Sequence, residues 1–102
     1  MKELELDTIR KNIDDLDTMI ITLLAQRSSL VSAAGKLKKD KQGVRDPKRV
    51  LQVIENVRAK AVASKLDPVI AEKIYRNIID CFVTEELREL NNDTDGKIAN
   101  LS

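Results

Sequence analysis

The chain of 102 residues is long enough for one domain with one hydrophobic core, and its 42% hydrophobic and 34% charged residues exclude disorder throughout. Lysine plus arginine total 18 and aspartate plus glutamate total 17, so the net charge of +1 offers no broad basic surface for nucleic acid. The sequence has no apolar run near the roughly 18 residues of a membrane span and no leader pattern, so we expect a cytoplasmic protein that binds no membrane.

The chain contains one cysteine, Cys81, and no histidine. A single cysteine excludes an intramolecular disulfide, and without histidine there is neither a Cys-His catalytic pair nor the usual ligand set of a zinc site. Cys81 stands beside the apolar Ile79 and Phe82, so we expect it to be a small core residue. We therefore expect a function that needs no metal and no cofactor.

The stretch from about Leu6 to Lys38 is predicted to form one long helix, with Asp7 as its N-cap. Apolar residues recur along it at alternating steps of four and three, the spacing of a helix that is packed along its length. These positions are Ile9, Ile13, Leu16, Ile20, Leu23, Leu30, Ala34 and Leu37. We refer to them as the apolar row.

Arg27 interrupts the apolar row, at the step that follows Leu23. An unpaired cation in a packed seam costs several kcal/mol of desolvation, so an anionic group should face it. Lys38 shares the face of Arg27, about 16 Å further along the axis, because eleven residues make almost three turns. The pair indicates an anion pocket between helices. Alternatively, Arg27 pairs with a carboxylate of a neighbouring helix and Lys38 is solvated near the helix end.

The length of this helix predicts a dimer. A helix of some 33 residues is about 50 Å long, whereas a domain of this size has a radius of gyration of about 13 Å, so one end must project beyond a single-chain core. Arg10 lies about 25 Å from Arg27 and roughly 100° around the helix, so the two cannot serve one pocket of the same chain. A symmetric dimer could bring Arg10 of one chain towards Arg27 of the other.

A second helix is predicted from Asp46-Pro47 to about Ser64, after a turn at Gln42-Gly43. Aspartate is a favoured N-cap and proline suits the first helical position, so this pair is a start signal. Arg49 then falls in the first turn. The apolar face of this helix consists of Val50, Leu51, Val53, Ile54, Val57 and Ala61.

A third helix is predicted from Asp67-Pro68 to about Leu90, after a connection at Lys65-Leu66. Glu86 continues its apolar stripe, either as a site residue or as a solvent-edge glutamate near a helix end. The stripe consists of residues four apart, Ile70, Ile74, Ile78 and Phe82. The fold class is therefore all-α, with a helical domain over residues 1–90 and a polar, flexible tail over residues 91–102.

Three helices with these spaced charges resemble the all-helical chorismate mutase family over about residues 6–90. The resemblance is carried by segments in a fixed order, Ile9-Arg10, Ala25-Gln26-Arg27, Gly35-Lys36-Leu37-Lys38 and Val44-Arg45-Asp46. Such enzymes are intertwined homodimers with two equivalent sites, and their substrate is a small dianion. The resemblance implies the same assembly and substrate class here.

The resemblance also implies which residues form the site. Arg27 and Arg10 of the partner subunit would clamp the two carboxylates of chorismate. Lys38 and a donor at Glu86 would stabilise negative charge on the breaking ether oxygen as prephenate forms. The residues of one chain implied in the pocket are Arg27, Lys38, Asp46, Arg49, Val50, Phe82 and Glu86.

Three of these positions depart from the usual family pattern. Typical members carry a glutamate in place of Val50, a small hydroxylated residue in place of Phe82 and a glutamine in place of Glu86. Val50 cannot accept the hydrogen bond of the substrate's ring hydroxyl, and Glu86 can donate one only when it is protonated. Burial favours the protonated acid, whereas Arg27 and Lys38 nearby would favour the carboxylate, and these two effects oppose each other.

The departures leave several functions open. The Arg49-Val50 pair and the stretch from Phe82 to Glu85 look more like two relatives of the same fold, isochorismate pyruvate lyase, which leaves salicylate, and aminodeoxychorismate mutase. A non-catalytic helical dimer is a further alternative, and a nucleic-acid-binding dimer has the least support. We expect chorismate mutase itself, in aromatic amino-acid biosynthesis, because it is the commonest activity on this scaffold.

Overall fold

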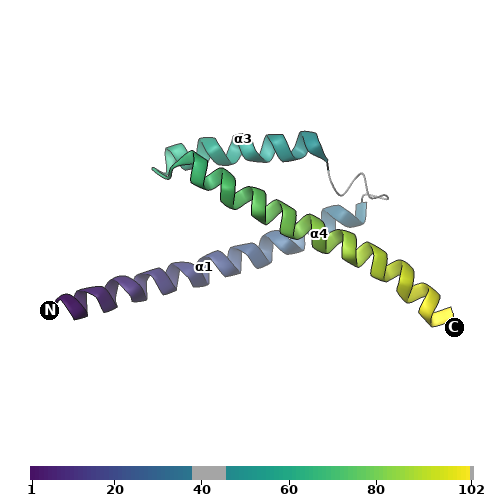
Figure 1. Cartoon of the computed structure of the whole chain (residues 1–102), viewed down its shortest axis with the longest axis horizontal. Helices are drawn as coiled ribbons and strands as arrows, with labels where there is room; N and C mark the ends of the chain where they lie inside the picture. Colours follow the sequence, from purple (N-terminus) through teal and green to yellow (C-terminus); the bar gives the residue numbers. More distant parts are fainter. Residues whose placement is uncertain (38–45, 102) are drawn as a thin grey trace. The chain divides into compact units, whose positions relative to one another are not determined.

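The computed structural model describes residues 1–37 and 46–101, with side chains up to residue 89. The described part of the chain folds into three helices, which confirms the all-α class (Figure 1). They are α1 (Lys2–Leu37), α3 (Pro47–Ala63) and α4 (Pro68–Leu101). The chain divides into two compact units, Met1–Ala33 and Ala34–Ser102, and α1 contributes to both.

Helix α1 begins at Lys2, earlier than the start predicted near Leu6, and the backbone amide of Glu5 already donates to the carbonyl of Met1 at 3.1 Å. Lysine, glutamate and leucine in residues 2–6 are good helix formers, and Glu3 and Glu5 place negative charge in the first turn, where the helix dipole favours it. Asp7 therefore lies inside the helix, and the prediction that it is the N-cap is wrong.

Helix α3 begins as predicted, with Asp46 as its N-cap and Pro47 as its first residue. The Asp46 carboxylate accepts hydrogen bonds from the backbone amides of Lys48 and Arg49, at 3.1 Å and 3.3 Å. Two of the amides that a helix start leaves without a backbone partner are thereby satisfied.

A tight turn ends α3 and reverses the chain. Lys65 adopts a left-handed conformation with φ 61, and its amide donates to the carbonyl of Val62 at 3.2 Å. The amide of Leu66 donates to the carbonyl of Ala61 at 2.8 Å. These two bonds form a Schellman motif, which satisfies carbonyls at the helix end without a glycine. The predicted connection at Lys65-Leu66 is confirmed.

Helix α4 begins at Pro68, as predicted, and the Asp67 carboxylate accepts from the amide of Val69 at 2.9 Å. The helix continues to Leu101, past the end predicted at about Leu90. The flexible tail over residues 91–102 stays a prediction.

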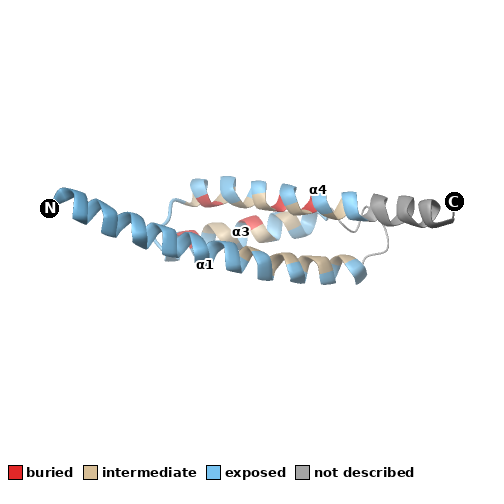
Figure 2. Ribbon diagram, turned by 90° about the horizontal axis from the view of Figure 1, so that it is seen from below, coloured by how far each residue is buried: buried red, intermediate tan, exposed pale blue. Residues whose placement is uncertain are grey.

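The core of the second unit lies between α3 and α4, which form a helical hairpin (Figure 2). Its central cluster consists of Ile54 from α3 and of Ile79 and Val83 from α4, which are 4%, 7% and 7% exposed. Half-buried side chains pack against the cluster from both helices, namely Val50, Val53, Tyr75 and Leu87. Ala61 and Ala71 are buried nearer the turn, where small side chains permit close approach of two helices.

The buried row of α4 lies one residue further along than predicted. Ala71, Ile79 and Val83 are buried, whereas Ile70 and Ile74 remain 48% and 49% exposed. Ile78 and Phe82, the other members of the predicted stripe, are half-buried. Adjacent rows on this helix are both apolar at four-residue spacing, so periodicity alone could not select the row that faces α3.

Cys81 is exposed, so the prediction that it is a core residue is wrong. It lies two residues from Ile79 and two from Val83, about 200° around the helix from each. Because those two residues face α3, Cys81 faces the opposite way.

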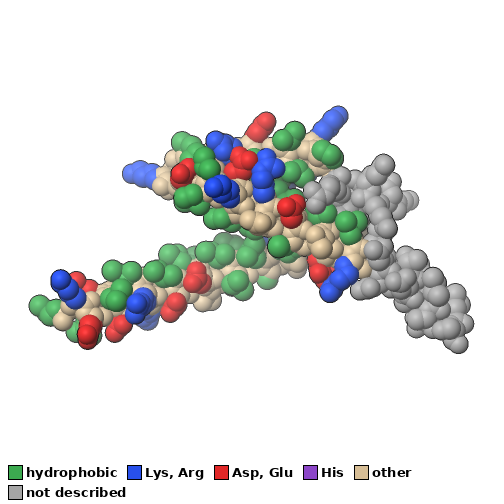
Figure 3. All heavy atoms as spheres, viewed as in Figure 1, with side chains coloured by type: hydrophobic (Ala, Val, Ile, Leu, Met, Phe, Trp, Pro, Cys, Tyr) green, Lys and Arg blue, Asp and Glu red, His purple; other side chains and the backbone are tan. Residues whose placement is uncertain are grey.

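In the unit Met1–Ala33, the apolar row is exposed along α1. None of the residues of α1 is buried, and Ile9, Leu16 and Leu23 are 55%, 57% and 59% exposed. Hydrophobic side chains follow the helix on the face seen in Figure 3. None of the described helices combines the length and the apolar character that crossing a membrane would require.

Candidate functional site

The predicted site residues are distributed over both units. Arg10 and Arg27 belong to Met1–Ala33. Lys38 lies outside the described residues, and so do Arg45 and the predicted turn at Gln42-Gly43. Of the predicted site residues that the structure describes, the second unit contains Asp46, Arg49, Val50, Phe82 and Glu86.

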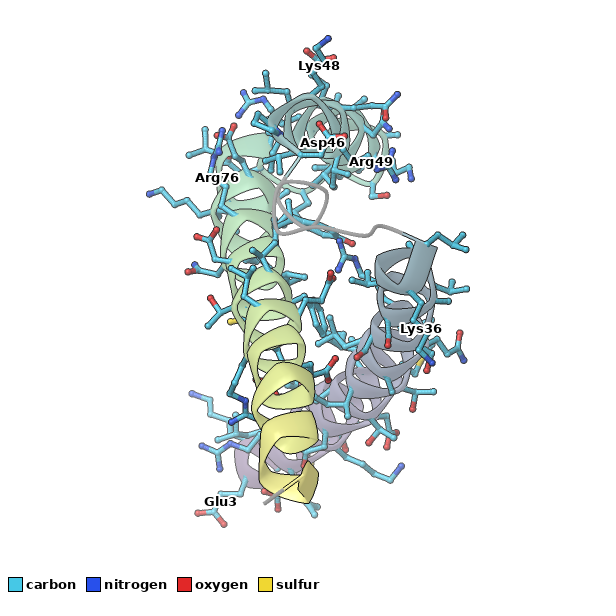
Figure 4. All side chains as sticks on the ribbon, turned by 90° about the vertical axis from the view of Figure 1, so that its right-hand side faces the viewer. Glu3, Lys36, Asp46, Lys48, Arg49 and Arg76 are labelled. Atoms are coloured by element: carbon cyan, nitrogen blue, oxygen red, sulfur yellow. The ribbon has the colours of Figure 1, made fainter. Side chains whose placement is uncertain are left out.

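The amino end of α3 positions the first two of these residues. Asp46 caps the helix, and Arg49 follows in the first turn, where its Nη1 donates to Oε1 of Gln52 at 2.7 Å. Lys48 and Arg49 are exposed, and the first turn of α3 carries no acidic residue (Figure 4). Two cations at the positive end of a helix dipole favour an anion. Gln52 was not a predicted site residue, although a spacing of three residues on a helix predicts its contact with Arg49.

Val50 contributes to the apolar core of the hairpin. It is half-buried and packs against the central cluster of Ile54, Ile79 and Val83. A glutamate at this position would place a carboxylate against that cluster, so valine suits the packing of the hairpin. The same position supplies no acceptor for a substrate hydroxyl.

Glu86 lies against the end of α1. A Cβ atom added at Gly35 would be 3.0 Å from Oε2 of Glu86 and 3.6 Å from its Cδ, so the carboxyl group occupies space that any side chain at residue 35 would need. Glu86 is half-buried and is therefore not a fully solvated glutamate at a helix end. The contact was not predicted, and the one signal for it in the sequence is a glycine inside a predicted helix, where alanine is favoured.

Arg10 and Arg27 differ in environment along α1. Arg10 is exposed, whereas Arg27 is half-buried, although both are long charged side chains on the same helix. Arg27 is half-buried although its neighbours in the apolar row, Leu23 and Leu30, are 59% and 73% exposed. Arginine remains charged under all ordinary conditions, so it brings a permanent positive charge into that setting.

An ion-pair network fastens α3 to α4 outside the core. Arg58 of α3 donates from Nη1 to Oε1 of Glu72 at 2.8 Å, and Arg76 of α4 donates from Nε to Oε2 of the same carboxylate at 2.8 Å. The hydrogen bonds from Arg76 and Arg58 lower the pKa of Glu72 below its ordinary value. None of these three residues was a predicted site residue, and we assign the network to the stability of the hairpin.

Comparison with known proteins identifies the family. The model of the family described as chorismate mutase type II matches residues 9–87. A protein of Methanocaldococcus jannaschii named chorismate mutase is 31% identical over 78 residues, which cover 74% of this chain and 78% of the relative. The matched region contains every predicted site residue, from Arg10 to Glu86. The chain therefore belongs to the chorismate mutase type II family.

Proposed function

We propose that this chain catalyses the rearrangement of chorismate to prephenate, a step of aromatic amino-acid biosynthesis. The observation that carries the proposal is the family match over residues 9–87, which spans every candidate residue in order. The exposed cations at the start of α3 and the half-buried Arg27 suit a substrate with two carboxylates.

The reaction needs positioning and charge stabilisation and no covalent intermediate. The ether C–O bond of the enolpyruvyl side chain breaks while a C–C bond forms to the ring, and no proton is transferred. Arg27 and Arg10 of the partner subunit clamp the carboxylates and fold the side chain over the ring. Lys38 stabilises the negative charge that develops on the ether oxygen.

Glu86, as a neutral acid, donates a hydrogen bond to the same ether oxygen. Support comes from its half-buried position on α4 and from the close approach of its carboxyl group to Gly35, which removes one side of the group from water. An ionised Glu86 would repel the developing charge, whereas the protonated acid can donate a hydrogen bond to it.

The working unit is an intertwined homodimer in which α1 of each chain packs along its counterpart. The support is the apolar row, which leaves Ile13 and Ile20 49% and 52% exposed in one chain. Burying a large aliphatic side chain completely contributes about 1.5–3 kcal/mol, so a row of them is a strong driving force for association. The same arrangement explains how Arg10, which is exposed in its own chain, serves a pocket.

Isochorismate pyruvate lyase is the second candidate function, and the packing of Val50 favours it. Because Val50 faces the central cluster and offers no acceptor, the site lacks the residue that would select the ring hydroxyl of chorismate. The same observation on Val50 also favours aminodeoxychorismate mutase, and the same experiment tests that activity.

The deciding experiment is a turnover assay of the purified protein on chorismate, isochorismate and aminodeoxychorismate, with identification of each product. We expect chorismate to be consumed fastest, with prephenate as product. Release of pyruvate and salicylate from isochorismate at a higher kcat/KM would instead establish the lyase. A folded dimer that turns over none of the three would make the chain a non-catalytic member of its family.

A further inference from the structure

We propose that Gly35 is a positioning residue for Glu86: the missing side chain at residue 35 allows the Glu86 carboxyl group to lie against the backbone of α1. The inference deepens the proposed function, because it specifies what holds the proposed donor in place. Both residues belong to the unit Ala34–Ser102, so the contact lies within one compact unit.

The geometry leaves too little room for a side chain at residue 35 unless the Glu86 carboxyl group moves. The distance of 3.0 Å from an added Cβ to Oε2 of Glu86 is shorter than the about 3.3–3.6 Å of an ordinary C–H···O contact. The next atom of the same group, Cδ, would be at 3.6 Å, which is normal contact. Among the described residues, the two atoms found within 4 Å of that Cβ, apart from the backbone of α1 itself, both belong to the Glu86 carboxyl group.

The backbone does not explain why residue 35 is glycine. Gly35 lies in the last turn of α1 and does not have a positive φ, so an L-residue could adopt its conformation. Glycine is less favourable than alanine in a helix, by up to about 1 kcal/mol in a helix interior. Helix formation therefore disfavours glycine here, and the close approach of Glu86 is the compensating feature that the structure offers.

Alanine at residue 35 should move the carboxyl group and leave the helix in place. The clashing atoms are at the far end of a side chain with several rotatable bonds, so a shift of a few tenths of an ångström relieves the contact. A reaction that depends on a positioned donor is sensitive to such shifts, and a misplacement of about 1 Å can cost about 100-fold in rate. Gly35→Ala is thus expected to stabilise the protein and to slow the reaction.

The test is a double-mutant cycle with Gly35→Ala, Glu86→Ala and the double variant, assayed on chorismate. We expect Gly35→Ala to lower kcat about tenfold with a smaller change in KM, since the donor is displaced while the carboxylate clamps are untouched. In the Glu86→Ala background the same substitution should leave kcat unchanged. An equal loss of kcat in both backgrounds would overturn the proposal, because the loss would then not pass through Glu86.

Thermal unfolding supplies a second readout that does not depend on activity. In the Glu86→Ala background, Gly35→Ala should raise Tm by about 4–8 °C, the shift for 1 kcal/mol in a domain of this size. With Glu86 present the rise should be smaller, because the methyl meets the carboxyl group. Equal rises in the two backgrounds would overturn the positioning role.

Ala33→Gly is the matched control, since it makes the reverse exchange two residues earlier in α1 at an exposed position. It should lower Tm and leave kcat unchanged. If the wild-type protein does not act on chorismate, the proposed function fails, while the comparison of Tm values still decides whether Gly35 accommodates Glu86.

Discussion

Helix α1 and the α3–α4 hairpin differ in how far their apolar side chains are buried. The hairpin buries Ile54, Ile79 and Val83 between two helices of one chain. Most of α1 carries as regular an apolar pattern and yet contains no buried residue. An apolar row therefore predicts a packed helix without specifying which chain supplies its partner, and substitutions in α1 and in the hairpin can test that difference.

The largest effect is expected from a charge in the apolar row. Leu16 is 57% exposed in one chain, and a substitution at an exposed position typically changes stability by about 0.5 kcal/mol or less. If the row instead packs against a second copy, Leu16→Asp buries an unpaired charge and should abolish the folded dimer. Sedimentation and circular dichroism measure this. Thr18→Asp is the control, because it adds the same charge about 200° away; a folded Leu16→Asp protein with wild-type mass would refute the packing of α1 on a second chain.

Substitution of either clamping arginine is expected to abolish activity almost completely. Arg10→Ala and Arg27→Ala homodimers should both be close to inactive, because each lacks a clamp for one substrate carboxylate in both sites. A mixed dimer retains one site without either lesion and should recover about half the wild-type activity per dimer, since its two sites are equivalent. Recovery is measured after the two variants are unfolded together and refolded. No recovery would indicate a site that is built within one chain.

Lys38→Ala is expected to lower kcat by at least about 100-fold, the scale for loss of one preorganised charge donor, with a smaller effect on KM. The reason is that, in the proposed mechanism, Lys38 acts on charge that exists mainly in the transition state. Steady-state kinetics on chorismate separate the two parameters. A raised KM with unchanged kcat would reduce Lys38 to a residue that only binds substrate. Lys36→Ala is the control, because Lys36 is an exposed lysine of α1 that lies two positions before Lys38 in the sequence.

The hairpin residue Glu86 is expected to control the pH dependence of the reaction. If the neutral acid donates to the ether oxygen, activity should fall as pH rises and the carboxyl group loses its proton. Glu86→Gln supplies a donor that does not titrate, so it should keep substantial activity and flatten the alkaline limb between about pH 5 and 8. The measurement is a profile of kcat against pH for both proteins. An unchanged profile in the variant would exclude Glu86 as the titrating donor.

The smallest effect is expected from the ion-pair network of the hairpin. Arg76 and Arg58 lower the pKa of Glu72 from its ordinary 4.5. The two ion pairs of Glu72 therefore stabilise the fold above about pH 4.5, and this contribution disappears as pH falls through the lowered pKa. Glu72→Gln should therefore have a slightly lower Tm than wild type at pH 7, and the difference should shrink towards pH 3. Glu55→Gln is the control, because it makes the same exchange at an exposed glutamate of α3. A constant difference in Tm at all pH values would contradict this account.

Local signals in the sequence determined the helices and the family. The two Asp-Pro pairs predicted the starts of α3 and α4, because capping and the fixed φ of proline act within a few residues. The ordered charges from Arg10 to Arg49 predicted the family that the match over residues 9–87 establishes. Both kinds of information are short in range or fixed in order, so no knowledge of packing was needed.

Only the tertiary structure decided which face of α4 is used. The sequence could not choose between the row of Ile74 and the row of Ile79 on α4, because both are apolar at the same spacing and the choice depends on the direction from which α3 approaches. It also could not place Gly35 beside Glu86, which are separated by 51 positions along the chain. A contact of this kind arises when two helices meet, and a pattern along one helix carries no information about where another helix crosses it.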